Sequence, residues 1–283
     1  IMNKYKILIL GTTGMLGSEM YKFFARDKKF QIFKMNRKYS KNSIKINIED
    51  QDDLINKIKL INPDFVINCI GWIKQKYVSG KMPYIINSQL PLFLSQLSLI
   101  LKFKLIHIST DCVFTGKTGN YLDNDKKDAE DLYGLSKNLG EVKNLNTTTL
   151  RTSIIGFENG LKKYGLLEWF LSQKINVKGF DKVLFSGLTT LELSKIIKRY
   201  IFNKKLYNNI LNVSSKPISK FELLKLIKIT FNKDVRITKC TKIKLNRTLN
   251  SKKFKKITSY KCPSWKKMLN EMHVVYKKDY ERI

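Results

Sequence analysis

Short apolar runs alternate with amphipathic segments through the first half of the chain. Each run is rich in Ile, Leu, Val or Phe and is followed by glycine or polar residues, which is typical of buried strands. We expect strands at 5–10, 30–35, the alternating Ile44, Ile46 and Ile48, 64–70, 104–109 and 148–152. The intervening segments have helical apolar spacing, and we expect helices at 15–26, 50–60, 85–101 and 133–143. Because strands and helices alternate, the pattern predicts an α/β fold with a Rossmann-type, doubly wound parallel sheet.

Beyond residue 153 the alternation is less regular. Ser219 and Glu222 form a capping box that predicts a helix through Thr230. Residues 210–213 have a strand-like pattern and are expected to return to the main sheet. The expected division is a Rossmann domain over 1–152, rejoined by about 186–213, and a smaller C-terminal substrate-binding lobe over 153–185 and 214–283.

Basic residues dominate the charge of the chain. Lys and Arg number 54 against 23 Asp and Glu, which gives a formal net charge of +31. Such a field attracts polyanions and anionic nucleotides alike. The favoured explanation is an AT-rich coding sequence, because Lys, Asn and Ile are abundant throughout. No local basic tract with interleaved aromatic residues suggests a stacking groove, so we expect no nucleic-acid partner.

The four cysteines are scattered and form no CxxC pair, so the sequence predicts neither a metal site nor a redox centre. Such cysteines fit a reducing cytoplasm, and we find no signal peptide in the sequence. The longest apolar stretch, 90–101, is too short to span a bilayer. We therefore expect a cytoplasmic protein that does not associate with membranes.

A glycine-rich turn follows the first expected strand and begins the first expected helix. Glycines at this position allow a tight turn and a close approach of the backbone to phosphates, and the helix N-terminus supplies N–H donors. The spacing is GxxGxxG, and a tight turn that binds no ligand is the alternative. The expected cofactor-binding residues here are Gly11, Thr13, Gly14, Met15, Leu16 and Gly17.

The second expected strand is followed by basic residues. A carboxylate at this place would bind the adenosine ribose of NADH and repel a 2′-phosphate. Asn36 carries no charge, and Arg37 and Lys38 would attract the phosphate instead. The sequence therefore favours NADPH over NADH, although basic residues are common everywhere in the chain.

Tyr133 and Lys137 lie four residues apart, which places them on one face of a helix. A nearby cation favours the phenolate and so lowers the cost of moving the tyrosine proton. Thr110 brings a hydroxyl to the end of the fifth expected strand, where a doubly wound sheet forms its ligand crevice. His107 is expected to be a buried strand residue. Asp111 either orients its neighbours or caps a turn.

Together these segments resemble a known family. Ser109-Thr110-Asp111-Cys112-Val113-Phe114, Gly119-Asn120-Tyr121 and Tyr133-Gly134-Leu135-Ser136-Lys137 with Gly140-Glu141 are similar to the extended short-chain dehydrogenases/reductases. Within them, the dTDP-4-dehydrorhamnose reductase type matches best. The resemblance continues through 150–153, more loosely through 185–190, and fades after about residue 235.

The resemblance implies NADPH-dependent reduction of the 4-keto group of a nucleotide-activated 6-deoxysugar in surface polysaccharide synthesis, by a possible homodimer. Thr110 would bind the carbonyl, Tyr133 would be the general acid, and Lys137 would hold the nicotinamide ribose and tune Tyr133. Further cofactor contacts would come from Asn47, Ile48, Cys69, Ile70 and Gly71. Further substrate contacts would come from Trp72, Asn87, Asp111, Cys112 and Thr189.

The chain departs from the family pattern at several positions. Asn47 replaces an aspartate, residues 72–82 replace a run of small residues, and 186–189 lack a proline. These departures favour a substrate other than the rhamnose precursor, with a UDP-linked 2-acetamido-6-deoxy-4-ketohexose as the leading candidate. The alternatives are a nucleotide-sugar epimerase or dehydratase with bound NAD, and a non-catalytic regulatory subunit of the same fold.

Overall fold

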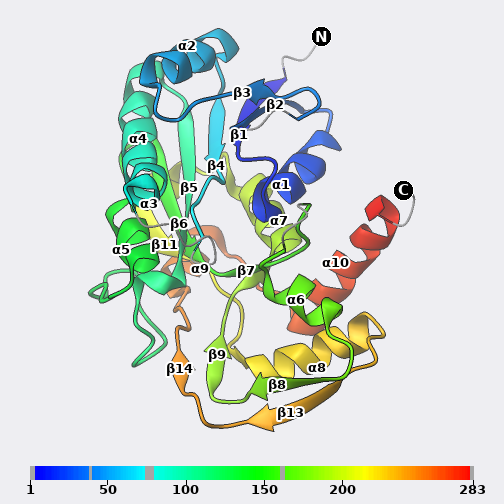
Figure 1. Cartoon of the computed structure of the whole chain (residues 1–283). Helices are drawn as coiled ribbons and strands as arrows, with labels where there is room; N and C mark the ends of the chain where they lie inside the picture. The colour runs from blue at the N-terminus through cyan, green and yellow to red at the C-terminus, as the bar shows by residue number, and fades with distance from the viewer. Residues whose placement is uncertain (1–3, 38–39, 74–79, 160–162, 281–283) are drawn as a thin grey trace.

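A seven-stranded parallel sheet forms the centre of the computed structural model, which describes residues 4–37, 40–73, 80–159 and 163–280 (Figure 1). The strand order is β3-β2-β1-β4-β5-β6-β11, which is the doubly wound Rossmann order and confirms the predicted fold class. The strands are β1 (Tyr5–Leu10), β2 (Phe30–Asn36), β3 (Ile44–Lys45), β4 (Phe65–Asn68), β5 (Lys104–Thr110), β6 (Thr147–Thr152) and β11 (Asn209–Asn212).

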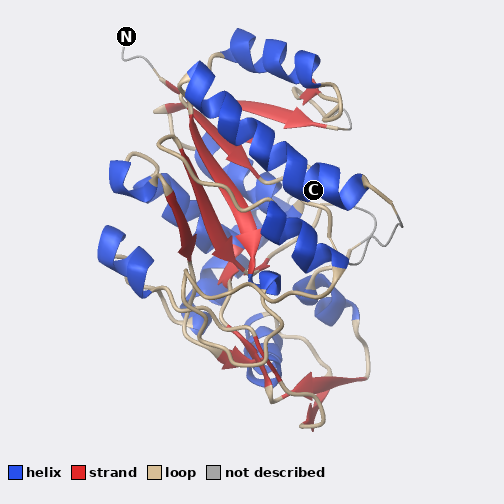
Figure 2. Ribbon diagram, turned by 90° about the vertical axis from the view of Figure 1, so that its left-hand side faces the viewer, coloured by secondary structure: helices blue, strands red, loops and turns tan. Residues whose placement is uncertain are grey.

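The continuous apolar runs arise because both faces of the sheet are buried. In β1, Ile7 and Ile9 belong to one core cluster, and Leu8 and Leu10 belong to the other. Helices α1 (Met15–Ala25) and α7 (Thr190–Tyr200) cover the first face, and α2 (Gln51–Ile61) and α4 (Leu90–Leu101) cover the second. Figure 2 shows helices on both sides of the fanned strands.

The helical run before β5 is longer than the sequence predicts. It consists of α3 (Met82–Tyr84), the π-helical turn η1 (Ile85–Gln89) and α4. Its 20 residues are long and apolar enough to cross a membrane, but half of the apolar window is buried in the fold. Leu90, Leu94 and Leu97 pack against the sheet, as expected for a core helix.

Several expected elements end early, and the structure shows the reason for two of them. β3 stops at Lys45 because its partner β2 ends at Asn36, so the alternation through Ile48 has nothing to pair with. Helix α5 (Leu132–Leu139) stops before Gly140, not at residue 143. Gly140 lies so close to the Asn87 backbone that an added Cβ would overlap its carbonyl oxygen, so the chain turns away there.

The smaller lobe lies below the sheet in Figure 1 and is built from short strand pairs. Ser219 caps α8 by accepting a hydrogen bond from the Glu222 N–H at 3.1 Å, at the predicted helix start. Besides α7 and β11, the elements after β6 are β7 (Ile154–Ile155), α6 (Leu166–Ser172), β8 (Asn176–Phe180), β9 (Val183–Phe185), β10 (Leu188–Thr189), η3 (Lys204–Leu206), β12 (Ile218–Ser219), α8 (Lys220–Thr230), β13 (Arg236–Cys240), β14 (Leu245–Asn246), α9 (Lys252–Thr258) and α10 (Trp265–Tyr280).

Candidate active site

The three glycines of the turn after β1 have different roles. Gly11 adopts a positive φ of 84°, which favours glycine. Gly17 is buried so close to Gly11 that any Cβ would overlap the Gly11 carbonyl, so this glycine permits helix and strand to touch. Gly14 caps α1 and is exposed, and a Cβ there would meet only the Gly11 oxygen at 3.5 Å. The turn therefore leaves room at the N-terminus of α1 for a phosphate group, which fits a dinucleotide cofactor.

The other residues of the turn divide between surface and core. Thr13 is exposed and Met15 is partly exposed beside Gly14, so both lie where a bound phosphate would be. Leu16 is buried in the core cluster under the sheet, and so offers its backbone rather than its side chain.

The end of β2 is neutral and closely packed against the turn. The Asn36 amide is buried, and its nitrogen donates to the Thr12 hydroxyl at 2.9 Å. Arg37 is exposed next to it, and Lys38 lies outside the described residues. Of the expected adenine contacts, Asn47 is exposed, whereas Ile48 is buried in the core beneath α2.

The end of β4 lies against the glycine turn. A Cβ on Gly11 would meet Ile70 atoms at 3.0 to 3.1 Å, and the Cys69 N–H donates to the Leu10 carbonyl. Burial raises the pKa of the Cys69 thiol to about 12, and the charge of Lys137 opposes that rise. Cys69 therefore lies between the strand that precedes the glycine turn, through its backbone, and Lys137, through its thiol. Gly71 follows at the surface.

Asn87 is fully buried in the π-helical turn and acts as a clamp. Its Oδ1 accepts a hydrogen bond from the Trp72 N–H at 2.8 Å, and its Nδ2 donates to the Trp72 carbonyl and to the Ser136 hydroxyl. The amide therefore ties the segment after β4 to α5. Its described hydrogen bonds hold the site together, so the expected contact with substrate stays a prediction.

Tyr133 projects from the first turn of α5 toward the end of β5. Burial raises the pKa of the phenol, the nearby Cys112 adds to the rise, and a hydrogen bond with the Thr110 side chain opposes it. The two hydroxyls named for catalysis therefore meet. The expected effect of Lys137, which is to favour the phenolate, stays a prediction, and burial is the largest cause of the net rise.

Lys137 is buried one turn further along α5, with 4% of its surface exposed. Its Nζ donates to the Ile108 carbonyl at 2.7 Å. Burial lowers the pKa of this ammonium to about 8, and Glu141 and Cys69 oppose the change. His107 is also fully buried, 3.1 Å from Asn68, as the sequence predicts for a strand residue.

The remaining expected substrate contacts differ in their surroundings. Burial raises the pKa of the Asp111 carboxyl and of the Cys112 thiol, the latter to about 12, and in both cases Arg247 opposes the rise. Thr189 is fully buried, and its hydroxyl caps α7 by accepting from the Glu192 N–H. Its side chain therefore has a structural role, and its contact with the sugar nucleotide stays a prediction.

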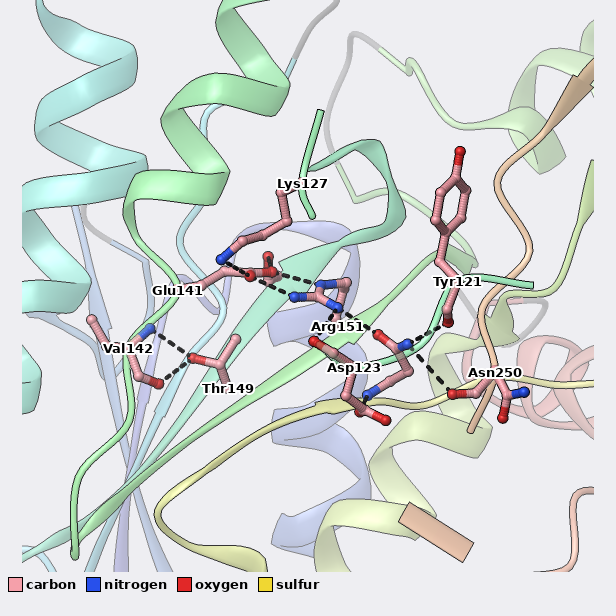
Figure 3. Close-up of polar contacts among 10 residues, drawn as sticks. Tyr121, Asp123, Lys127, Glu141, Val142, Thr149, Arg151 and Asn250 are labelled. Atoms are coloured by element: carbon pink, nitrogen blue, oxygen red, sulfur yellow. Dashed lines mark hydrogen bonds and ion pairs between the residues drawn. The ribbon is translucent and has the colours of Figure 1, made fainter. Parts of the chain in front are cut away.

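A buried ionic network, for which no role was expected from the sequence, lies around Glu141 and Arg151 (Figure 3). The Arg151 guanidinium donates to both carboxylate oxygens of Glu141, at 2.8 and 2.7 Å. Lys127 lies 3.5 Å from the same carboxylate, and Ser109 donates to it at 2.8 Å. Arg151 also donates to Asn212 at 2.8 Å, which joins β6 to β11. The available signal was an arginine inside an otherwise uncharged strand.

Comparisons with known proteins identify the family and the fold. The family model described as "RmlD substrate binding domain" matches residues 5–164. "Spore coat polysaccharide biosynthesis protein SpsK" of Bacillus subtilis (strain 168) is 28% identical over 155 residues, 52% of each chain. "Methionine adenosyltransferase 2 subunit beta" of Rattus norvegicus is 27% identical over 197 residues, covering 64% of this chain and 54% of the relative. The chain thus spans about half the length of the curated relatives it matches.

A solved structure extends the likeness in fold to nearly the whole chain. It is a dTDP-4-dehydrorhamnose reductase from Bacillus anthracis str. Ames in complex with NADP, with a TM-score of 0.82 and 20% identity. The alignment covers 96% of this chain and 100% of that one. Most of the smaller lobe lies beyond the last residue that the family model matches, and it therefore also has a counterpart of known fold.

Proposed function

Because the chain belongs to the RmlD family of extended short-chain dehydrogenases/reductases, we propose that it reduces the 4-keto group of a nucleotide-activated 6-deoxysugar with NADPH. The observation that carries this proposal is that the side chains of Thr110 and Tyr133 lie beside each other at the C-terminal end of β5, with Lys137 buried one turn away. This end of a doubly wound sheet is where ligands bind. The product would serve surface polysaccharide synthesis in the cytoplasm.

The proposed roles follow from the protonation states. A bound nicotinamide cofactor supplies the hydride. The ordinary pKa of a tyrosine is 10.0 and burial raises that of Tyr133, so the phenol carries its proton at neutral pH and can donate it to the oxygen at C4. The Thr110 hydroxyl lies within hydrogen-bonding reach of that phenol and would hold the same oxygen. The Lys137 ammonium would bind the cofactor ribose, and charged Lys137 would favour the tyrosinate that the transfer leaves behind.

We propose NADPH as the preferred cofactor because the end of β2 carries Asn36 and the exposed Arg37 in place of a carboxylate. The Asn36 amide is held by the Thr12 hydroxyl, and it brings no negative charge that would repel a 2′-phosphate. Replacing Arg37 by Gln should raise the Michaelis constant for NADPH and leave that for NADH unchanged. A wild-type preference for NADH would contradict the proposal.

The decisive experiment is NADPH oxidation with a panel of dTDP-, UDP- and GDP-linked 4-keto-6-deoxysugars. We expect turnover, with the UDP-linked 2-acetamido sugar as the best substrate, because the segment after β4 departs from the rhamnose type. The Thr110→Val variant serves as a control, since it removes one of the two hydroxyls and should lose most of the rate. Absence of turnover with the whole panel would contradict the reductase assignment.

A second candidate is a non-catalytic regulatory subunit. It is supported by the match to a protein named as a subunit beta, over 64% of this chain. The presence of Thr110, Tyr133 and Lys137 together favours the reductase instead. Co-purification with a larger enzyme, combined with no turnover on the sugar panel, would favour the subunit. Tightly bound NAD in the purified protein would favour an epimerase or dehydratase.

A further inference from the structure

The edge of the main sheet at which the strands begin lies opposite the candidate active site, which is at their C-terminal ends. Neighbouring strands pair in parallel from β2 to β11, so their first residues meet at this one edge. In Figure 2 the arrowheads of the central strands point toward the smaller lobe, which leaves this edge at the far end of the molecule. We call the segments that precede these strands the edge surface: Lys4 with Tyr5, 26–29, 59–64, 99–104, 143–146 and 201–208.

Large apolar side chains are exposed on the edge surface. Leu60, Leu145 and Ile100 have 87%, 73% and 70% of their surface exposed. The other exposed members of this group are Tyr5, Leu99 and Phe202. A single exposed apolar residue is ordinary, whereas a group of them on one side of a molecule indicates a contact surface.

The turn that carries Leu145 is fixed to the end of α4, which carries Ile100. The Asn146 amide nitrogen donates to the Ser98 carbonyl at 2.8 Å. The Lys104 ammonium, at the start of β5, donates to the Leu145 carbonyl at 3.1 Å. These bonds hold Leu145 and Ile100 on the same side of the molecule and leave both side chains exposed.

Further contacts continue the edge surface toward β1. The Tyr5 and Phe202 rings lie 4.7 Å apart, and the Phe65 ring lies 5.2 Å from that of Phe202. The Lys6 ammonium donates to the Ile61 carbonyl at 3.1 Å, which fixes β1 to the end of α2. The strands β1, β4, β5 and β6 are consecutive in the sheet and together span about 15 Å. The exposed apolar groups therefore belong to one compact surface.

Positive charge surrounds these apolar groups. The edge surface contains two acidic residues, and one of them, Asp27, is paired with Lys198 at 2.7 Å. The other, Asp64, accepts a hydrogen bond from the Lys6 N–H at 2.7 Å. The exposed lysines of the edge surface include Lys29, Lys59, Lys102, Lys143, Lys204 and Lys205. Apolar side chains surrounded by lysines are typical of surfaces that lie in the interface of an anionic bilayer.

We propose that the edge surface binds the surface of an anionic lipid bilayer. The exposed apolar side chains would enter the headgroup region, and the lysines would lie against the lipid phosphates. The sequence led us to expect no membrane contact because no apolar stretch is long enough to span a bilayer, and a contact of this kind needs no spanning segment. It would leave the C-terminal end of the sheet, with Tyr133, facing the solution.

Other occupants match this surface less well. A second copy of the chain in a symmetric contact would bring the same lysines against these lysines, and like charges repel. A nucleic acid would satisfy the lysines, but aliphatic side chains such as Leu60, Ile100 and Leu145 offer no ring on which a base could stack. A bilayer uses both the charge and the apolar groups.

Vesicle sedimentation of the full chain tests this proposal and does not depend on turnover. Vesicles of phosphatidylcholine alone would be compared with vesicles that also contain phosphatidylglycerol. We expect binding to the anionic vesicles, weakened by added salt, and little binding to the neutral ones. Lys102→Gln/Lys143→Gln should lower the partition coefficient by about 10- to 30-fold, as expected for two lysines near an anionic surface. Ile100→Ser/Leu145→Ser should lower it by about 5- to 20-fold, because less apolar surface is then buried.

Matched control variants lie on the smaller lobe. Ile175 and Ile229 are as exposed there as the apolar residues of the edge surface, and Lys174 and Lys178 are exposed near Ile175. Ile175→Ser/Ile229→Ser and Lys174→Gln/Lys178→Gln should each leave the partition coefficient within about twofold, the change expected from long-range attraction alone. The affinity for NADP⁺ should be unchanged in every variant, which reports an intact fold.

Three results would overturn the proposal. The first is an equal loss in the control and edge-surface variants, or equal binding to neutral and anionic vesicles. The second is a dimer in sedimentation velocity that Ile100→Ser/Leu145→Ser dissociates, because a second copy would then cover the surface. The third is binding of duplex DNA at physiological salt that Lys102→Gln/Lys143→Gln abolishes, because the lysines would then serve a nucleic acid.

Discussion

Lys137 and Arg151 are two buried cations with opposite surroundings. Their exposed fractions are similar, 4% and 1%. Arg151 meets a carboxylate through two hydrogen bonds and an amide through a third. Lys137 donates to a backbone carbonyl, and its burial lowers the pKa to about 8. The charge of a buried cation with a matched anion is satisfied within the fold, whereas one held by a neutral acceptor can respond to a ligand. The comparison separates a structural cluster, which contains Glu141 and Arg151, from a chemical cluster, which contains Thr110, Tyr133 and Lys137.

The largest expected effect is on the chemical side of this comparison. Tyr133→Phe removes the donated proton while keeping the ring, so kcat should fall by about 10²- to 10⁴-fold. NADPH affinity and thermal stability should stay close to those of the wild type. Steady-state kinetics, a fluorescence titration with NADPH and a melting curve measure the three quantities. Near-normal rates in this variant would show that Tyr133 is not the acid.

The largest expected effect on the structural side is on stability. Glu141→Leu leaves the Arg151 guanidinium buried without its carboxylate, which should cost about 3–5 kcal/mol in the free energy of unfolding. The double variant Glu141→Leu/Arg151→Met removes both charges and should recover most of that loss. Urea denaturation measures all three proteins. If the double variant is no more stable than the single one, the unpaired charge is not the cause.

The pH dependence should follow Lys137. The ammonium is lost as the pH rises through about 8, so kcat/KM for NADPH should fall above that value. In Lys137→Arg the guanidinium stays charged, and this decline should disappear. For stability the sign is opposite. The pKa in the folded protein lies below the ordinary 10.5, so the cost of burying the charge is complete below pH 8 and is relieved between about 8 and 10.5.

The pH profile also sharpens the comparison, because the two clusters interact. The Glu141 carboxylate opposes the lowering of the Lys137 pKa. Replacing Glu141 by Gln should therefore move the decline in kcat/KM to lower pH. A profile that does not move would show that the two clusters are electrostatically independent.

The smallest expected effect is at Ser109, which lies between the clusters. Its hydroxyl donates to Glu141 and so belongs to the structural side, although Thr110 next to it belongs to the chemical side. Ser109→Ala should lower the free energy of unfolding by about 1 kcal/mol and change kcat little. Thr110→Val should do the reverse. A larger loss of rate in Ser109→Ala than in Thr110→Val would contradict this division.

Local patterns explain what the sequence could predict. The alternation of strands and helices predicted the parallel sheet. The glycine turn and the Tyr133–Lys137 pair could be identified because each depends only on residues that are close in sequence. The hydroxyl of Thr110 was placed correctly beside Tyr133 because the ends of parallel strands meet at one edge. These features need only the periodicities of strand and helix.

Features that depend on distant contacts could not be predicted. Arg247 reaches Phe114 across 133 positions, and no local pattern indicates this pairing. Burial is the largest cause of the pKa shifts of Tyr133 and Lys137. Burial depends on how distant segments pack, and the four-residue spacing of these two side chains does not predict it. The same holds for the pairing of Glu141 with Arg151, because an arginine inside an uncharged strand shows that it needs a partner but not which of the 23 acidic residues supplies it.

The seventh strand, β11, joins the sheet only after the first part of the smaller lobe has been synthesised. Until Asn212 emerges, β6 is an open edge and Arg151 lacks one of its acceptors. A fragment that stops at residue 164, where the family model stops, would present these unpaired groups to other chains, and we expect it to aggregate. The part of the chain that the family model matches, residues 5–164, is therefore shorter than the part that we expect to fold independently, which includes β11.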